Sequence, residues 1–200
     1  SRFYYNTFNQ DSIKNFVNNI AIEDSVATLR WVRKADPDQQ ISNSNTFNNL
    51  FNSDRYSSDC RNGYTALMIL CRFSSRIQYA SKFIQELLDR KCKVDLQTEN
   101  GMTALMIAIE ANNHNSVEIV EKLIRAGSDV NFKKYFAVPM DYAMRFATMF
   151  AVNSPVNPLI VKVLIEAGAD LELCTGNNKV SRIVAALSKD PISNEFMNFL

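Results

Sequence analysis

The residue types that most often carry catalysis or metal binding are scarce in this chain of 200 residues. It contains one histidine, His114, which excludes multi-histidine metal sites and leaves one candidate partner for any serine or cysteine nucleophile. His114 falls in a predicted turn between two helices, where a structural role is favoured over catalysis. Ala167-Gly168-Ala169 is typical of a helix end, and no glycine-rich phosphate loop occurs. The sequence therefore predicts no catalytic residue, no metal site and no cofactor for this chain alone.

The four cysteines show no paired spacing; they are Cys60, Cys71, Cys92 and Cys174. A chain of 200 residues can build an apolar core without disulfides, so we interpret them as reduced thiols of an intracellular protein. Cys71 aligns with Ile109 when the similar segments described below are superposed. This alignment predicts a buried and inert thiol rather than a nucleophile.

The overall composition is that of a soluble globular protein. Hydrophobic residues make up 46% of the chain, charged residues 22%, and the net charge is +1, which predicts no bulk attraction to nucleic acid or membrane. The most apolar run, residues 137–152, is interrupted by Asp141 and Arg145, so no transmembrane segment is expected. No secretory signal peptide is visible. We expect an excised piece of a longer protein that is a monomer on its own.

The most legible stretch, residues 99–132, is predicted to form turn, helix, turn, helix, turn. Thr103 can cap the first helix, and Asn115 with Glu118 forms a capping box for the second. Gly127 suits the left-handed end of that helix. The apolar positions predicted inside are Leu105, Ile107, Ala108, Ile109, Val117, Val120, Leu123 and Ile124. A helix pair this short cannot bury its own apolar faces, so it needs similar units on either side.

Similar units are present in the chain. Residues 63–70 (G-Y-T-A-L-M-I-L) match 101–108 (G-M-T-A-L-M-I-A), and residues 138–143 occupy the same position again. Residues 161–172 match 120–131, the end of the second helix and its turn. Two submotifs that recur in order, at a spacing close to the ankyrin period, resemble the ankyrin-repeat family. The resemblance implies an all-α solenoid of helix-turn-helix units.

We expect residues 1–58 to form a helical lead-in or degenerate cap followed by an Asn/Ser-rich linker. Within it, residues 12–37 carry two helical patterns, and residues 38–58 are interpreted as a long connection or mobile insertion. Residues 59–200 are interpreted as ankyrin repeats, at about 59–97, 98–133 and 134–174, with a partial repeat at 175–200.

Three irregularities are expected within these repeats. The first clear repeat has extra residues, which predict an extended second helix along Ile77, Ala80, Phe83, Ile84, Leu87 and Leu88. Lys91 stands where Gly127 stands in the central repeat, so its turn is expected to adopt another shape. An insertion at 148–157 precedes Pro158, which is expected to open a helix at its favoured first position.

The resemblance implies that a host protein binds the concave face, which consists of the projecting turns and the surface of the first helices. The first-helix positions that it assigns are Tyr64, Arg72, Phe73, Met102, Glu110, Asn112, Arg145 and Phe146. The turn positions are Lys91, Lys93, Lys133, Lys134, Tyr135 and Phe136. We consider residues 133–136 the best single candidate, although a solvated turn with its aromatics folded inward fits this segment equally well. Arg90, Lys91 and Lys93 could extend it into a basic ridge that faces an acidic partner.

The richness in Asn, Ile, Lys, Ser and Phe, together with the irregular repeats, indicates a pathogen or symbiont protein. The sequence resembles the C-terminal ankyrin domain of the OspC family of type III secreted effectors. That resemblance implies a virulence role in the host cell cytoplasm, recruitment of an inflammatory caspase, and an NAD-dependent arginine ADP-riboxanase half upstream. The alternatives are a poxvirus-type or other bacterial ankyrin protein, or an integral part of an enzyme to whose catalytic domain residues 1–58 contribute.

Overall fold

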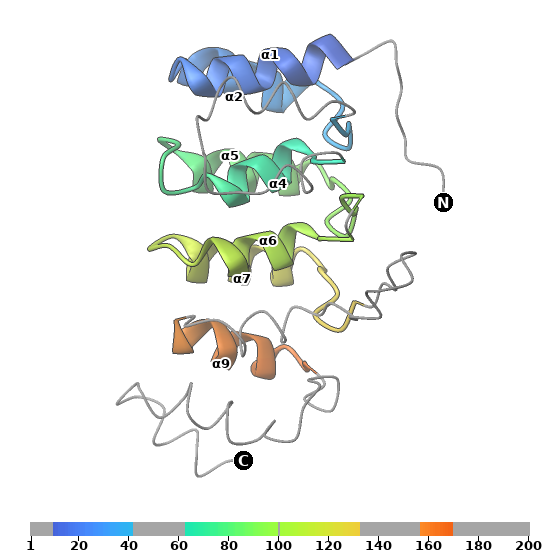
Figure 1. The fold of residues 1–200 in the computed structure, drawn as a ribbon, viewed down its shortest axis with the longest axis vertical. Coiled ribbons are helices and arrows are strands. Elements are labelled where there is room, and N and C mark those ends of the chain that lie inside the picture. The colour runs from blue at the N-terminus through green and yellow to red at the C-terminus, as the bar shows by residue number, and fades with distance from the viewer. Residues whose placement is uncertain (1–9, 42–62, 100, 133–156, 170–200) are drawn as a thin grey trace.

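The computed structural model describes residues 10–41, 63–99, 101–132 and 157–169 (Figure 1). In these ranges the secondary structure is entirely helical. The helices are α1 (Gln10–Ala21), α2 (Ser25–Lys34), α4 (Ala66–Arg72), α5 (Ala80–Asp89), α6 (Ala104–Ala111), α7 (Ser116–Arg125) and α9 (Pro158–Glu166). None of them is long and apolar enough to cross a membrane.

The helices pair and the pairs stack along the long axis of the molecule (Figure 1). Helix α1 packs on α2, α4 on α5 and α6 on α7; between pairs, α4 contacts α6, while α2, α5, α7 and α9 follow one another. The turns within pairs lie along one edge, at the left of Figure 1, and the connections between pairs lie along the opposite edge. We name these the turn edge and the finger edge, and we call each connection between pairs a finger. The all-α helix-turn-helix solenoid expected from the sequence is confirmed.

One apolar core runs through the stack, from Ile13 in α1 to Leu164 in α9. Residues 66–71 of α4 and 104–109 of α6 are each at most 1% exposed. In α7, Val120 and Leu123 are fully buried as predicted. Ile119 is buried too, whereas Val117 and Ile124 only pack against the rim of the core. The core depends on contact between units, as a solenoid requires.

The first helix pair is held together by aromatic packing and a side-chain hydrogen bond. The rings of Phe16 and Trp31 lie 4.5 Å apart, and the Trp31 indole donates to the Ser12 carbonyl at 2.8 Å. Asp24 caps α2 by accepting from the Ala27 amide. Within residues 11–21 of α1 the exposed positions are Asp11, Asn15 and Asn18, all of them polar.

The N-terminal caps of two helices are those that the sequence indicates, and the cap of a third helix is not. Thr65 and Thr103 each accept a hydrogen bond from the amide three residues ahead, as N-caps do. The capping box predicted at Asn115 and Glu118 is wrong, because the Asn115 side chain makes no cap hydrogen bond. The side-chain amide group of Asn115 instead donates to the backbone carbonyl of Ser74 at 3.0 Å. A partner in the neighbouring unit has replaced the local one.

Three helix ends share one geometry, the Schellman motif. The Gly127 amide donates to the Ile124 carbonyl at 2.9 Å, and Gly168 closes α9 in the same way. Lys91 closes α5 likewise, with φ +56° and a 2.8 Å bond to the Leu88 carbonyl. The expectation that this turn adopts another shape is therefore wrong. The lysine takes the left-handed conformation at a cost of about 1 kcal/mol.

The predicted extension of α5 is also wrong, because α5 and α7 both have 10 residues. The extra residues lie in the turn 73–79, which bends back on itself where the Arg76 amide donates to the Phe73 carbonyl at 2.8 Å. Helix α9 begins at Pro158, as predicted, and Asn157 caps it.

Backbone hydrogen bonds close the base of the first finger, which connects α2 to α4. The Ile41 amide donates to the Tyr64 carbonyl at 2.9 Å, and the Gly63 amide donates to the Ile41 carbonyl at 2.7 Å. In the next unit, Thr98 and Met102 close the equivalent finger. Residues 42–62, between Ile41 and Gly63, fall outside the described residues. The first helix expected for the third repeat and the partial repeat at 175–200 fall outside the described residues.

Candidate protein-interaction surface

Two of the predicted contact residues are buried in the structure. Tyr64 is 7% exposed and Met102 is 6% exposed, so the expected exposure of these positions is wrong. The reason is that both close the base of a finger. The Tyr64 carbonyl accepts from Ile41, and the Met102 amide donates to the Thr98 hydroxyl at 3.1 Å. Both side chains belong to the apolar core and hold the fingers in place.

Arg72 and Glu110, predicted as separate contact residues, bind each other. The Arg72 guanidinium lies 2.6 Å from the Glu110 carboxylate and joins the C-terminal ends of α4 and α6. The Arg72 side chain is only 13% exposed, whereas that of Glu110 is 42% exposed. This pair couples two units and leaves part of one carboxylate open to a partner.

The two remaining predicted positions at the turn edge are also tied to the scaffold. Phe73 is partly buried and packs against the core. Asn112 is exposed with φ +41°, and its side-chain oxygen accepts from the Asn157 amide at 3.2 Å. Asparagine tolerates this left-handed conformation well. Asn112 therefore links the turn between α6 and α7 to the start of α9.

Lys91 and Lys93 lie at the finger edge, on the opposite side of the stack from Arg72. Both are exposed. The Lys93 amide donates to the Asp38 carboxylate at 2.7 Å, and its ammonium group lies 3.9 Å from the same carboxylate. Arg90, the third member of the predicted basic ridge, donates to the Val32 carbonyl at 2.6 Å. The predicted contact residues are thus divided between two edges.

Successive fingers are connected by polar contacts. The Asp129 amide donates to the Asp95 carboxylate at 3.1 Å, and the Asn131 amide group donates to the Gly168 carbonyl at 2.9 Å. Burial raises the pKa of Asp95, and the hydrogen bond from Asp129 only partly offsets this. These contacts fix the spacing of the fingers, so that neighbouring turns present one continuous surface.

The outer helices carry a second series of contacts between units. Arg33 of α2 binds Glu86 of α5 through two hydrogen bonds of 3.0 and 2.7 Å. The hydrogen bond from Arg33 lowers the pKa of Glu86, and the same bond raises the pKa of Arg33. Bidentate geometry of this kind fixes both groups in orientation.

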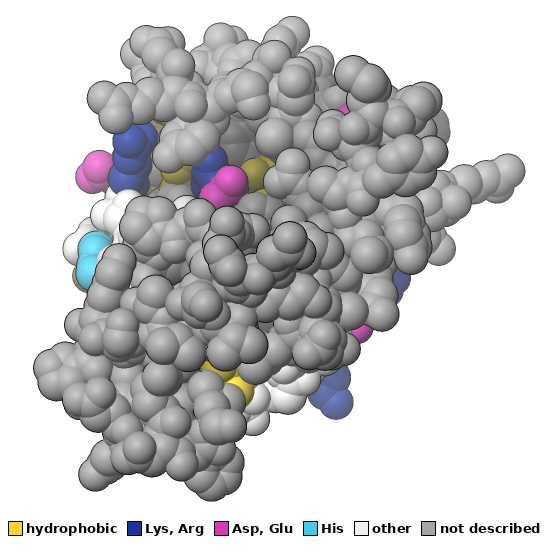
Figure 2. Space-filling view, turned by 60° about the horizontal axis from the view of Figure 1, so that its bottom comes forward, with side chains coloured by type: hydrophobic (Ala, Val, Ile, Leu, Met, Phe, Trp, Pro, Cys, Tyr) yellow, Lys and Arg dark blue, Asp and Glu magenta, His cyan; other side chains and the backbone are white. Residues whose placement is uncertain are grey.

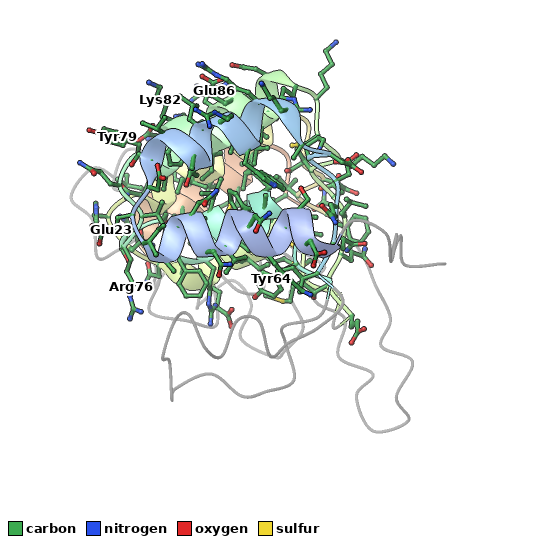
Figure 3. All side chains as sticks on the ribbon, turned by 90° about the horizontal axis from the view of Figure 1, so that it is seen from above. Glu23, Tyr64, Arg76, Tyr79, Lys82 and Glu86 are labelled. Atoms are coloured by element: carbon green, nitrogen blue, oxygen red, sulfur yellow. The ribbon has the colours of Figure 1, made fainter. Side chains whose placement is uncertain are left out.

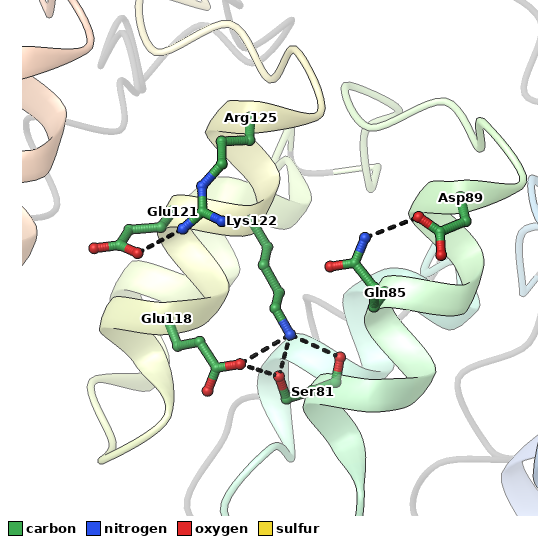
Figure 4. A network of polar contacts seen from close by, with 7 residues as sticks. All are labelled: Ser81, Gln85, Asp89, Glu118, Glu121, Lys122 and Arg125. Atoms are coloured by element: carbon green, nitrogen blue, oxygen red, sulfur yellow. Dashed lines mark hydrogen bonds and ion pairs between the residues drawn. The ribbon is translucent and has the colours of Figure 1, made fainter.

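Between α5 and α7, Ser81, Glu118 and Lys122 form one network (Figure 4). The Ser81 hydroxyl donates to the Glu118 carboxylate. The Lys122 ammonium lies 2.8 Å from that carboxylate and donates to the Ser81 hydroxyl at 2.6 Å. The hydrogen bonds from Lys122 and Ser81 hold the pKa of Glu118 below its usual range. Glu118, predicted to cap its own helix, instead joins α7 to the preceding unit.

His114 and Cys71, the two side chains weighed as nucleophile or base, lie where the sequence predicts, in a turn between helices and in the core. His114 is exposed in the turn between α6 and α7, and Figure 2 shows its imidazole in cyan at the surface. Cys71 is fully buried, and burial raises the pKa of its thiol above the ordinary value. Burial, with the nearby Asp38 carboxylate, raises the pKa of Cys92 to about 11. Among the described residues no group of three acidic, cysteine or histidine side chains could hold a metal ion.

Six predicted contact residues lie outside the described residues: Lys133, Lys134, Tyr135, Phe136, Arg145 and Phe146. At the upper left of Figure 2, basic side chains lie next to acidic ones. At the turn edge, the exposed residues that the sequence did not single out include Arg76, Tyr79 and Lys82. The signal that could have found them is the longer turn of the first clear repeat.

A family model for ankyrin repeats in three copies matches residues 39–134 and, in an overlapping alignment, residues 78–175. A putative ankyrin repeat protein of Acanthamoeba polyphaga mimivirus is 36% identical over 84 residues. The matched segment is 40% of this chain and 15% of that relative, so the chain corresponds to a small part of it. The resemblance to the OspC family gains no support from these matches. The family model covers more than half of the chain and agrees with the stacked helix pairs: the chain belongs to the ankyrin-repeat family.

Proposed function

We propose that this chain is a protein-binding module whose finger edge recognises an acidic surface of its partner. The observation that carries the proposal is the choice of residue at the end of α5. Lys91 is exposed and adopts φ +56°, where the equivalent ends of α7 and α9 have Gly127 and Gly168. A glycine would remove the strain. The lysine places a cation at the root of a finger, beside Lys93.

The polar contacts between fingers support this proposal because they make the edge rigid. Asp38 holds the backbone of Lys93, and Asp95 holds that of Asp129. A surface fixed before binding loses less conformational entropy when a partner docks. Lysines at the rim of such a surface mainly accelerate and orient the encounter with an acidic partner. Residues 133–136 continue the chain from the next finger, so Lys133 and Lys134 belong to the same proposal.

The finer identity of the partner is also a proposal. The giant-virus relative favours the viral alternative, in which the module docks a protein of an infected host cell. The effector alternative, with an inflammatory caspase as the bound protein and a catalytic half upstream, rests on the sequence resemblance alone. Either alternative places the protein in the cytoplasm of the host cell.

The test begins with capture of partners from amoebal lysate and, separately, with purified inflammatory caspases. Titration calorimetry then compares the parent chain with a Lys91→Glu/Lys93→Glu variant and a Lys133→Glu/Lys134→Glu variant. We expect at least tenfold weaker binding for each. The melting temperature should be unchanged in Lys133→Glu/Lys134→Glu and slightly lower in Lys91→Glu/Lys93→Glu, because Lys93→Glu removes the ion pair with Asp38. Lys14→Glu, on the first helix of the stack, serves as the control for a charge reversal outside the finger edge.

Unchanged affinity in both double variants would exclude the finger edge as the binding surface. Incubation of the chain with NAD and a caspase, followed by mass spectrometry, tests the enzymatic alternative. A mass increase on the caspase with this chain alone would overturn the proposal that the chain only binds.

A further inference from the structure

The turn edge carries the large hydrophobic side chains that are most exposed in the described part of the chain. They are Ile22, 72% exposed, Val26, 70% exposed, and Tyr79, 56% exposed. Ile22 lies in the turn before α2, Val26 at the start of α2, and Tyr79 directly before α5. Because α2 and α5 pack side by side, their starts are neighbours. We name these three residues, with Arg76 and Lys82, the Tyr79 patch.

Tyr79 is unfavourable for folding in three respects. It adopts φ +65°, a left-handed conformation that is uncommon for a bulky residue. It is the N-cap of α5 but makes no side-chain cap hydrogen bond, where Asn, Asp, Ser or Thr would supply one. Its ring is more than half exposed. Strained residues of this kind concentrate at sites of function.

The cations beside Tyr79 have no acidic partner among the described residues. Arg76 and Lys82 form no ion pair there, whereas Arg33, Arg72, Lys122 and Arg125 each bind a carboxylate of the scaffold. Lys82 acts on Glu86 only weakly, as the smallest contribution to the lowered pKa of that carboxyl. Figure 3 shows Arg76, Tyr79 and Lys82 projecting outward from the same side of the molecule, with Glu23 from the unit above.

We propose that the Tyr79 patch binds a protein segment that presents an apolar side chain flanked by carboxylates. The Tyr79 ring, with Val26 and Ile22, would cover the apolar side chain, and exposed tyrosines of this kind dominate the energetics of many interfaces. Arg76 precedes Tyr79 in the sequence and Lys82 follows it. These two side chains would supply the cations that bind the flanking carboxylates. This surface is separate from the finger edge, which lies on the opposite side of the stack (Figure 1).

The probe is a 12-residue peptide with one central phenylalanine flanked by two glutamates on each side and otherwise composed of serine and glycine. Two matched peptides replace the glutamates by lysine or the phenylalanine by glycine. Backbone amide shifts of the isotope-labelled chain are recorded during each titration. We expect the first peptide to shift the amides of residues 22–26 and 76–82, and at least tenfold weaker binding of the other two.

Three variants separate binding from folding. Tyr79→Asn should raise the melting temperature, because asparagine fits the left-handed cap, and should weaken peptide binding at least tenfold. Arg76→Glu/Lys82→Glu should abolish binding with the fold retained. Lys34→Glu, an exposed cation at the far end of α2, is the control and should leave binding unchanged.

The proposal is overturned if the three peptides bind equally, or if the shifts map away from the patch. It is also overturned if the shifts at the patch grow with protein concentration alone, since a second copy of the chain would then be the occupant. The Lys91→Glu/Lys93→Glu variant should bind the peptide normally. Failure of the Tyr79-patch proposal can therefore be distinguished from failure of the proposal that the finger edge binds a partner.

Discussion

The guanidinium of Arg72 lies 2.6 Å from the carboxylate of Glu110, and the two side chains come from equivalent positions of neighbouring units. Arg72 is largely covered, whereas Glu110 reaches solvent. An ion pair that is half shielded from water is screened less than a surface pair. We therefore expect a larger interaction energy between Arg72 and Glu110 than between exposed partners on one outer helix, such as Arg125 and Glu121.

A double-mutant cycle tests this difference. Arg72→Ala, Glu110→Ala and the double variant should yield a coupling energy of about 1 kcal/mol in chemical denaturation, near the upper limit for exposed pairs. The control cycle uses Arg125 and Glu121, which lie 2.7 Å apart on one helix with side chains 69% and 40% exposed. Its coupling should be about 0.3–0.5 kcal/mol. Equal couplings in the two cycles would contradict the argument from shielding.

The end of α5 provides a second prediction. Lys91→Gly should raise the free energy of unfolding by about 1 kcal/mol, because glycine adopts the observed φ of +56° without strain. The reciprocal change Gly127→Lys should lower it by a similar amount. Lys93→Gly is the control and should destabilise, because Lys93 has no positive φ, so that glycine adds freedom to the unfolded chain. The ion pair of Lys93 with Asp38 is lost as well. A loss of stability in Lys91→Gly would show that the lysine side chain supports the fold.

The features that the sequence predicted are those determined within one unit. Thr103 caps its helix and Gly127 ends the next because both act on backbone groups at most four residues away. Asn115 and Glu118 have equally good local signals, yet Ser74 and Ser81 of the preceding unit take their side chains. A single sequence does not reveal which local hydrogen bond a neighbouring unit will replace.

The predicted exposure of Tyr64 and Met102 and the prediction of Arg72 and Glu110 as separate contact residues were wrong for the same reason. Tyr64 and Met102 occupy equivalent positions of two repeats, and their burial follows from the closure of their fingers by Ile41 and Thr98. Arg72 and Glu110 neutralise each other only because α4 and α6 stack in register. Tyr79 was missed because its turn was predicted to be helical. Tertiary context, rather than propensity, decides exposure at each of these positions.

Glu118 makes stability depend on pH in one direction. Its pKa is lower in the folded chain than in the unfolded chain, so its contribution is present above the unfolded value and is lost as the pH falls through the folded value. Glu118→Gln should therefore lower the melting temperature at pH 7, with a deficit that disappears in acid. Glu121→Gln on the same helix is the control and should change it less. A deficit that persists in acid, below the pH at which Glu118 of the folded chain is protonated, would contradict the assigned cause.

Asp95 should act in the opposite direction. Burial raises its pKa in the folded chain, so folding favours the protonated form and stability falls as the pH rises from the unfolded value through the folded one. Asp95→Asn should therefore raise the melting temperature at pH 7, because the amide oxygen can still accept from Asp129. The gain should shrink as the pH is lowered below the folded pKa. A gain that is constant with pH would mean that ionisation of Asp95 is not its source.

Gly63 and Gly127 share a positive φ but differ in their surroundings. A Cβ atom at Gly63 would lie 3.0 Å from the Thr98 backbone and 3.1 Å from that of Glu99, whereas at Gly127 it would meet nothing within 4 Å. Gly127→Ala should therefore cost only the left-handed strain, about 1 kcal/mol. Gly63→Ala should cost about 2–4 kcal/mol, because two fingers must also separate. Chemical denaturation of the two variants measures the difference. In Gly63→Ala the amides of Ile41 and of residue 63 should also exchange faster with solvent, since their hydrogen bonds close the finger that is forced apart. Equal costs and unchanged exchange would mean that the two fingers are not in contact.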